Sequence, residues 1–284
     1  MKPKNKYTSL DLEFWANVKL LNQRLGYFER KTKKNPNPDF VIPTTEQVKN
    51  TFKQEGLNYS KLIENNKWTD FGKNMIGYFK FRKKVLNEQI EPNLMDAKSA
   101  KTLFKKLKKE LKPTCPLPLN KQKGKKKDFA FFTGIINMLI EKNARGKPCN
   151  YNPMELTAIT INGFPLRTLS RRVDGAFPIV INPVAIWEIK EYYHTTTFGS
   201  RVADGVYETL LDGFELREAE ENINRKVKHY LMVDDYFTWW TLGRSYLCRI
   251  VDMLQMGFID EALFGKEVVD RIPTLVKEWI KDLR

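Results

Sequence analysis

The sequence predicts an α/β protein, in which a basic and mainly helical N-terminal domain precedes a domain built around a mixed sheet. Three observations lead to this expectation. Residues 128–235 follow the order helix, three strands, helix, strand. The chain before them has mostly helical spacing. A segment rich in Pro and Lys, residues 115–127, separates the two patterns. We therefore expect one domain at residues 1–127 and a second at residues 128–284.

The N-terminal part contains two helical patterns. Residues 8–31 place apolar side chains on one stripe of a helix. In residues 43–66 a Thr cap opens a helix at about residue 45, and Gly56 ends it. A second short helix, from about residue 59 to residue 66, completes a pattern that resembles a helix-turn-helix. Such a unit either reads DNA or simply packs as a helical pair.

Lysine dominates the end of this domain. Residues 97–112 have the pattern of a basic amphipathic helix. Such a helix can bind along phosphates, bind to a membrane surface or simply be solvated. The linker after it contains further lysines that can clamp a nucleic-acid backbone. Beside Lys121, the candidates for DNA contact in this linker are Lys123, Lys125, Lys126 and Lys127.

The net charge of the 284-residue chain is +15, and it is unevenly distributed. Residues 1–127 contain 30 Lys and Arg against 12 Asp and Glu, a net charge of +18. Residues 128–284 contain 19 against 22, a net charge of −3. A general lysine bias would raise the charge of both parts. The asymmetry therefore favours an N-terminal region that binds a polyanion, and nucleic acid is the partner we expect.

Composition excludes several classes of protein. A hydrophobic content of 42% with 12% aromatic residues is typical of a globular chain. No apolar run approaches the roughly 20 residues that span a bilayer, and the first residues lack the apolar core of a secretion signal. The three cysteines lie far apart, without zinc spacing, and fit a reducing compartment. We expect an intracellular, cytoplasmic protein without membrane contact. Because no GxxxxGK[ST] loop is present, we expect no ATP.

The elements of the second domain follow from its apolar patterns. Asp128 is expected to cap an apolar helix that continues to Glu141 and Lys142. Three extended runs come next, at residues 155–163, 166–177 and 184–193. The elements expected after them are a long helix at 199–225, a strand at 227–235 and a mostly helical region from residue 246 to the end.

The strand expected at residues 184–193 carries charge in an apolar run. Side chains alternate along a strand, so Glu188 and Lys190 share one face with Ile186. Isolated charges among apolar neighbours are costly. The pair is therefore either at the surface, paired with another group, or bound to an ion. An ordinary cross-strand ion pair stays a plain alternative, as does a simple turn at Asp174-Gly175.

A second carboxylate, on the neighbouring extended run, suggests that this strand binds a divalent cation. Asp174 precedes the strand of Glu188 by one extended segment, and two adjacent carboxylates favour a hard divalent cation such as Mg²⁺. A lysine on the same face offsets charge or orients a water molecule. Such a set suits phosphodiester hydrolysis, with one or two Mg²⁺ ions per site.

These residues resemble the motif of the PD-(D/E)XK, or restriction-endonuclease-like, nuclease superfamily. The match consists of Asp174 in RRVDGAF and Glu188-Ile189-Lys190 in WEIK, with Val173 where the superfamily's name has Pro. The order of elements over residues 128–235 is similar to that of its core. The resemblance implies a restriction-endonuclease-like fold, with a mixed central sheet flanked by helices.

The resemblance also implies roles for individual residues. Asp174 and Glu188 would bind the metal, and Lys190 would lie at the attacking water. Many members carry a further Glu on the first helix of the core, and Glu141 occupies the matching place as a catalytic and metal-binding candidate. Basic residues near such a metal centre help to hold a DNA backbone. The candidates for this role are Arg171, Arg172 and Arg201; surface ion pairs are the alternative for Arg171 and Arg172.

We therefore expect a Mg²⁺-dependent endonuclease that cuts double-stranded DNA. A compact chain with its own basic domain and no motor is most similar to a prokaryotic type II restriction endonuclease, which often acts as a homodimer. A repair or RNA-processing nuclease of the same superfamily remains open, and so does a non-catalytic DNA-binding protein. The sequence leaves the recognition sequence and the role of His194 undefined.

Overall fold

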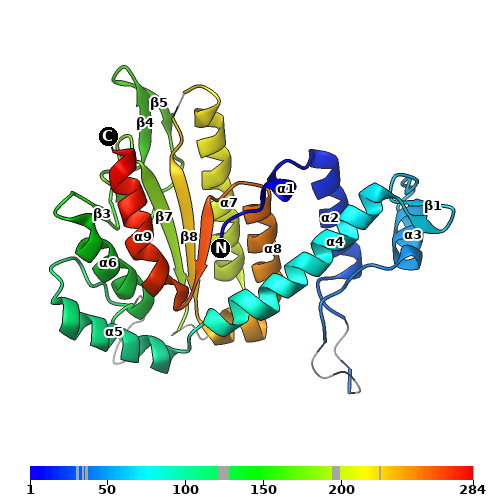
Figure 1. The fold of residues 1–284 in the computed structure, drawn as a ribbon, viewed down its shortest axis with the longest axis horizontal. Helices are drawn as coiled ribbons and strands as arrows, with labels where there is room; N and C mark the ends of the chain where they lie inside the picture. Colours follow the sequence, from blue (N-terminus) through cyan, green and yellow to red (C-terminus); the bar gives the residue numbers. More distant parts are fainter. Residues whose placement is uncertain are drawn as a thin grey trace. The chain divides into compact units, whose positions relative to one another are not determined.

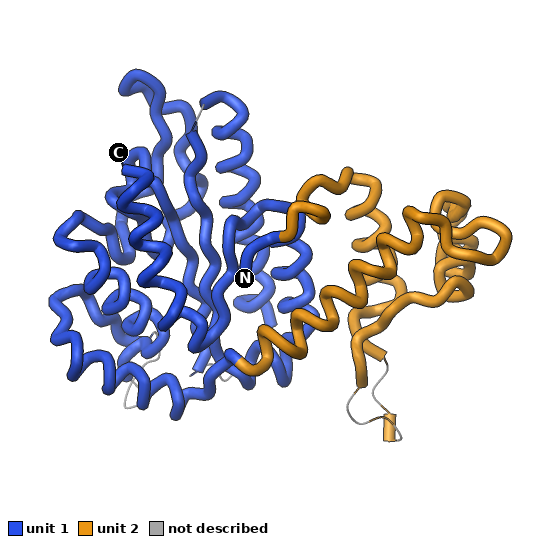
Figure 2. The backbone as a smooth tube through the Cα atoms, in the orientation of Figure 1, with its two compact units in different colours: residues 1–3, 93–284 blue, residues 4–92 orange. Residues whose placement is uncertain are grey.

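The computed structural model describes residues 1–29, 32–33, 35, 38–120, 128–193, 199–223 and 225–283. The chain forms two compact units, one of residues 4–92 and one of residues 1–3 and 93–284 (Figure 2). This division differs from the boundary predicted at residue 127. The reason lies in the helix after residue 96, whose buried Phe104 and Leu107 belong to the same core as the helix that starts at Phe131. The basic helix is thus part of the larger unit.

The smaller unit is mainly helical, as the sequence predicts. Aromatic side chains hold it together: the Tyr78 ring packs edge-on against Tyr7 and Trp15 with ring centroids 5.0 Å apart in both pairs. Its elements are α1 (Asn5–Thr8), α2 (Leu12–Leu25), α3 (Thr45–Gln54), β1 (Ile63–Glu64), β2 (Lys67–Trp68), α4 (Asp70–Val85) and η1 (Leu86–Ile90) (Figure 1).

The predicted helix-turn-helix is wrong. The first helix is present as α3, whose Thr44 and Gln47 form a reciprocal cap. The expected second helix at residues 59–66 is replaced by the start of a hairpin, in which β1 pairs with β2. Asn65 and Asn66 have φ of 47° and 61°, which is the left-handed backbone of a two-residue hairpin turn. The Asn-Asn pair was the sequence signal for this turn.

The larger unit contains the remaining elements (Figure 1). The short helix η2 (Glu91–Asn93) spans the boundary between the two units, and α5 (Ala97–Leu111) and α6 (Phe131–Ala144) come before the sheet. The strands and helices that follow are β3 (Asn150–Tyr151), β4 (Ala158–Ile161), β5 (Phe164–Thr168), β6 (Gly175–Phe177), β7 (Ala185–Glu191), α7 (Ser200–Glu220), β8 (Lys228–Asp234), η4 (Phe237–Leu242), α8 (Arg244–Gln255), β9 (Glu261–Phe264) and α9 (Glu267–Asp282).

A five-stranded mixed sheet forms the centre of this unit, in the order β3-β6-β7-β8-β9. The β6–β7 pair is antiparallel, whereas β7, β8 and β9 run parallel. The β4–β5 hairpin, which turns at Asn162-Gly163, is a separate two-stranded sheet. The predicted mixed α/β fold with helices around a mixed sheet is therefore confirmed.

Three details of the predicted order are corrected. The run at 155–163 lies in the hairpin and not in the central sheet. The region after residue 246, predicted to be mostly helical, contains the buried strand β9, which pairs with β8. Helix α6 begins at Phe131, and Asp128 instead pairs with Lys101 at 2.6 Å.

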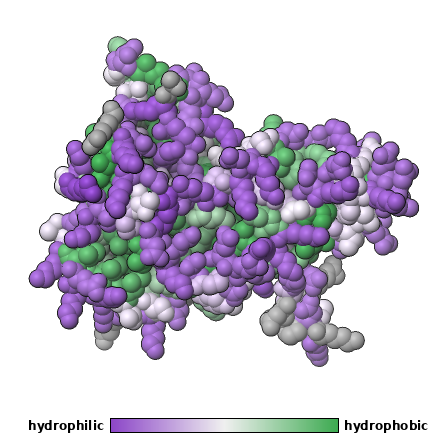
Figure 3. All heavy atoms as spheres, viewed as in Figure 1, coloured by the Kyte–Doolittle hydropathy of each residue, from purple (hydrophilic) through white to green (hydrophobic). Residues whose placement is uncertain are grey.

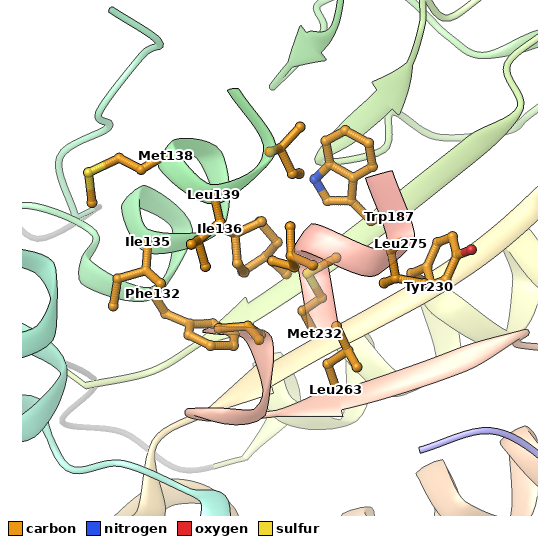
Figure 4. Packing of buried hydrophobic residues seen from close by; sticks show 14 of the residues in the cluster. Phe132, Ile135, Ile136, Met138, Leu139, Trp187, Tyr230, Met232, Leu263 and Leu275 are labelled. Carbon is orange, nitrogen blue, oxygen red and sulfur yellow. The ribbon is translucent and has the colours of Figure 1, made fainter. Parts of the chain in front are cut away.

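Helices cover the sheet on both faces. On one face, α6 and α9 pack against Trp187, Tyr230 and Met232, as Figure 4 shows for part of this core, and α5 packs on α6. On the other face, residues of α7 pack with Ile186 in a second cluster. Because β7 alternates, Glu188 and Lys190 lie on the α7 face. Among the helices that the structure describes, none has the length and apolar character needed to cross a membrane.

Candidate active site

Two neighbouring strands bring Asp174 and Glu188 together. Gly175 pairs with Trp187 in the β6–β7 ladder, so Asp174 stands just before β6 and beside Glu188. The Asp174 N–H donates to the Trp187 carbonyl at 3.1 Å and to Glu188 Oε1 at 3.2 Å. In return, the Ile189 N–H donates to Asp174 Oδ2 at 2.7 Å. The backbone of each strand therefore fixes the carboxylate of the other.

Gly175 is required by packing and not by a turn. A Cβ atom on this residue would lie 2.1 Å from the Trp187 indole, which lies against the glycine. Trp187 in turn stacks on Trp279, with ring centroids 5.4 Å apart and planes 7° from parallel. The plain interpretation of Asp174-Gly175 as a turn is wrong, because Gly175 is the first residue of a buried strand. This packing fixes the position of β6 and with it the backbone of Asp174.

The Glu188–Lys190 pair is buried. Glu188 is 0% exposed and Lys190 is 8% exposed, and their charged groups meet at 2.8 Å. A surface ion pair on a half-exposed sheet would be solvated, so that alternative is excluded. Lys190 also reaches Glu208 of α7 at 3.3 Å. The charged strand is thus accepted because its charges are paired in the interior.

Arg171 joins three carboxylates from two elements, β7 and α7. Its Nη1 lies 3.0 Å from Glu188 Oε1 and 2.7 Å from Asp212 Oδ2. Its Nη2 lies 3.3 Å from Glu208 Oε2, which Lys190 also contacts. Together with Asp174, these side chains form what we call the charged cluster: Arg171, Asp174, Glu188, Lys190, Glu208 and Asp212. The sequence left Arg171 either on phosphate or in a surface ion pair, whereas the structure pairs it with carboxylates, two of which are buried.

Helix α7 supplies the two cluster residues that the sequence analysis missed. Glu208 and Asp212 are four residues apart and lie on one face of the helix. Gly205 lies on the same face, one turn earlier, and a Cβ there would be 3.1 Å from Lys190 Cδ. The lack of a side chain at 205 lets the Lys190 stem lie against the helix. The available signal was an acidic pair at helical spacing after a strand with charged residues.

The cluster shifts the pKa values of its members in opposite directions. Burial and the nearby Glu188 raise the pKa of Asp174 to about 6. Burial opposes ionisation of Glu188 as well, but Lys190 and Arg171 lower its pKa below the ordinary value. Burial likewise opposes the charge of Lys190, yet Glu188 and Asp174 raise its pKa. At neutral pH the site therefore has an ionised Glu188 and a protonated Lys190.

The donor set fits a magnesium ion with few protein ligands. Among the described residues, Asp174 Oδ2 accepts from Ile189 and Oδ1 accepts no hydrogen bond. Glu188 Oε2 accepts from Lys190 and keeps a second lone pair. No group of three or more His, Cys, Asp and Glu in the described part of the chain is placed to hold a metal. Mg²⁺ is often bound by one or two carboxylates with water and substrate phosphates, so two carboxylates suffice.

Glu141 does not reach the charged cluster. It lies on α6, which packs on the Trp187 and Ile189 face of the sheet, opposite the cluster. Its carboxylate accepts a hydrogen bond from the Thr114 N–H at 3.1 Å. The expectation of a catalytic and metal-binding Glu141 is therefore corrected. The helix was predicted well, but its sequence does not tell which face of the sheet it covers.

The other predicted basic residues lie outside the cluster. Arg172 is exposed and contacts the sulfur of Met154. Arg201 is exposed in the first turn of α7, where its carbonyl accepts from the Tyr192 hydroxyl at 3.0 Å. It therefore lies one turn before Gly205, on the side from which Lys190 approaches. Lys121, Lys123, Lys125, Lys126, Lys127 and His194 lie outside the described residues.

Comparisons with protein families divide the chain as the structure does. Residues 95–279 match the model of a domain of unknown function, DUF7687. Residues 1–89 match that of another domain of unknown function, DUF7690. The interval between the two matches contains the boundary of the compact units. No curated protein and no solved structure matches the chain. The charged cluster lies within the first match.

Proposed function

The chain belongs to the DUF7687 family, and from its charged cluster we propose that it is a Mg²⁺-dependent nuclease that hydrolyses phosphodiester bonds of DNA. The observation that carries this proposal is the buried Glu188–Lys190 pair with the Asp174 carboxylate beside it. Purely structural ion pairs seldom offset the cost of burial. A carboxylate with an open oxygen and a raised pKa next to such a pair is typical of a reactive site.

Each side chain has a task that its environment supports. Asp174 and Glu188 would hold the ion, which supplies Lewis-acid stabilisation to a phosphate oxygen when bound. Lys190 is kept protonated by Glu188, so its ammonium can donate to a phosphate oxygen or orient a water molecule. The backbone N–H of Ile189 holds Asp174 in place. Glu208, whose side chain is 43% exposed, marks the solvent side of the cluster.

Basic residues of the same unit support a polyanionic substrate. Residues 93–127 contain 12 Lys and Arg against 2 Asp and Glu, a net charge of +10. Six exposed lysines project from α5 and its end: Lys98, Lys105, Lys106, Lys108, Lys109 and Lys112. Hydrophilic side chains line the edge of the surface over α5 (Figure 3). More than half of the excess charge of the first 127 residues therefore belongs to the unit with the charged cluster, which favours phosphate binding there.

Double-stranded DNA is the substrate we propose, with a restriction-endonuclease-like core and a sequence-specific type II activity. Two active sites can cut both strands in one binding event, so we propose a homodimer as the working form. The experiment is plasmid cleavage, with and without Mg²⁺, by the wild type and by the Asp174→Asn and Lys190→Met variants. We expect discrete Mg²⁺-dependent fragments from the wild type and a loss of at least about 100-fold in rate in both variants.

A matched control is Lys226→Met. Lys226 lies before β8 and forms an ion pair with Asp260 at 2.9 Å, away from the charged cluster, so cleavage should persist. A DNA-binding protein without activity would retain DNA but leave it intact at any Mg²⁺ concentration. Cleavage of folded RNA in preference to duplex DNA would indicate an RNA-processing nuclease. Equal cleavage by the wild type and both site variants would contradict the proposed site.

A further inference from the structure

The balance of charge in the cluster is the starting point of a further inference. With every carboxylate ionised, Asp174, Glu188, Glu208 and Asp212 contribute four negative charges. Arg171 and Lys190 contribute two positive charges. The remaining charge of −2 balances the +2 of one divalent ion, but only half of the +4 of two ions. A second ion would meet net repulsion unless one of the two side-chain cations left.

Arg171 occupies the place between the carboxylates of β7 and α7. Its guanidinium lies within 3.3 Å of Glu188, Glu208 and Asp212. These three acids come from two elements that converge at one point, as ligands of a cation would. A guanidinium is always charged and presents several donors in one plane, so it can bridge carboxylates as a fixed cation. Lys190 cannot substitute for it, because its ammonium lies between Glu188 and Glu208 only.

Asp212 has one carboxylate oxygen that makes no hydrogen bond with the described part of the chain. The residue is 0% exposed, and its Oδ2 accepts from Arg171. Its Oδ1 is buried and has no hydrogen-bond partner in the part of the chain that the structure describes. A buried carboxylate oxygen without a partner is costly in a purely structural cluster. It is the atom to which a small cation can bind if Arg171 is removed.

We propose that Arg171 takes the place of a second metal ion, so that the site binds a single divalent ion, at Asp174 and Glu188. This inference rests on the proposed metal-dependent function and specifies its metal stoichiometry. The Arg171 guanidinium neutralises the α7 half of the cluster permanently. Glu208 and Asp212 are in this arrangement ligands of Arg171 and not of the metal.

The test counts bound Mn²⁺, which takes the same oxygen ligands as Mg²⁺, by calorimetry and by the electron paramagnetic resonance of the free ion. We expect one ion per chain in the wild type and none at this site in Asp174→Asn. In Arg171→Ala we expect two ions, because Glu208 and Asp212 then have no guanidinium partner. The double variant Arg171→Ala, Asp212→Asn should return to one ion. Far-UV circular dichroism checks that each variant is folded.

Asp212→Asn alone tests the inference without removing Arg171. If Asp212 is not a metal ligand in the wild type, this variant still binds one ion, with an affinity within about tenfold of the wild type. Loss of an ion in Asp212→Asn overturns the inference. So do two ions in the wild type, or one ion in a folded Arg171→Ala. A wild type that binds no ion refutes the metal site of the proposed function itself, and the inference with it.

Discussion

At the scale of the residue, the charge state of Asp174 links stability to pH. Its carboxyl has a pKa of about 6 in the folded chain, raised from the ordinary 3.8 by burial and by Glu188. The folded state therefore keeps a proton that the unfolded state has lost between these values. It follows that this group lowers the free energy of unfolding as pH rises from about 4 to about 6.

Asp174→Asn should remove this dependence. Without divalent ions, we expect the variant to exceed the wild type in unfolding free energy by about 1–2 kcal/mol at pH 7, and by little at pH 4. With Mg²⁺ at pH 7, the wild type should gain stability and the variant should not. Urea unfolding at both pH values, with and without Mg²⁺, measures these differences. A difference between the two proteins that is the same at pH 4 and pH 7 would contradict the assigned pKa.

Single residues also show how far the sequence could predict the site. Alternation along one apolar strand was enough to place Glu188 and Lys190 on one face, and the structure confirms it. Arg171 was expected on phosphate or in a surface ion pair, because a sequence does not show which buried acid lies opposite an arginine. The role of Gly175 depends on Trp187, a contact between strands that no local pattern contains.

At the scale of the element, α7 illustrates why an acidic pair was missed. The helix predicted at residues 199–225 is present, but the spacing of its apolar residues does not mark its buried face. Phe214 is 51% exposed, whereas Asp212 is buried. The face toward the sheet contains glycine, threonine and acidic residues, because it meets the charged strand β7. Hydrophobic periodicity fails where a helix covers a polar site, since the partner decides what is buried.

Helix α5 is the element on which we expect DNA contact. Its exposed lysines include Lys105 and Lys109, one turn apart. Replacing both with Gln should lower the slope of log affinity against log salt by about 1–2, because fewer counter-ions are released. The matched control is Lys277→Gln with Lys281→Gln, an exposed pair of the same spacing on α9. Fluorescence anisotropy with duplex DNA over a range of salt measures the slopes. Equal effects of the two pairs would contradict a specific role for α5.

At the scale of the whole molecule, the change of composition near residue 127 was mistaken for the domain boundary. The structural boundary lies between residues 92 and 93, because α5 buries its apolar stripe on α6. Charge and proline content indicate which segments are exposed to solvent. A compact unit is instead defined by the packing of its apolar side chains. The basic helix therefore belongs to the unit that contains the charged cluster.

Divalent ions and DNA should protect different segments from hydrogen exchange. Mn²⁺ should slow exchange of the Asp174 and Ile189 amides, because these N–H groups donate to the carboxylates that would hold the ion. At a Mn²⁺ concentration of about 100 times its dissociation constant, amide exchange can slow by about 100-fold where exchange requires an opening that releases the ion. Peptides from residues 12–25 and 45–54, in the smaller unit, should be unchanged by the ion.

Duplex DNA added in Ca²⁺, which occupies oxygen sites without the small octahedral geometry of Mg²⁺, should extend protection to α5. Mass spectrometry of peptides from residues 97–111, 171–193 and 200–216 separates the two effects. Protection by Mn²⁺ spread evenly over both units would indicate general stabilisation and contradict a local site. If DNA protects both residues 97–111 and residues 171–193, substrate binding and the charged cluster lie in one unit. Protection confined to residues 12–25 and 45–54 would instead assign DNA binding to the smaller unit, and the lysines of α5 would then be ordinary solvated charges.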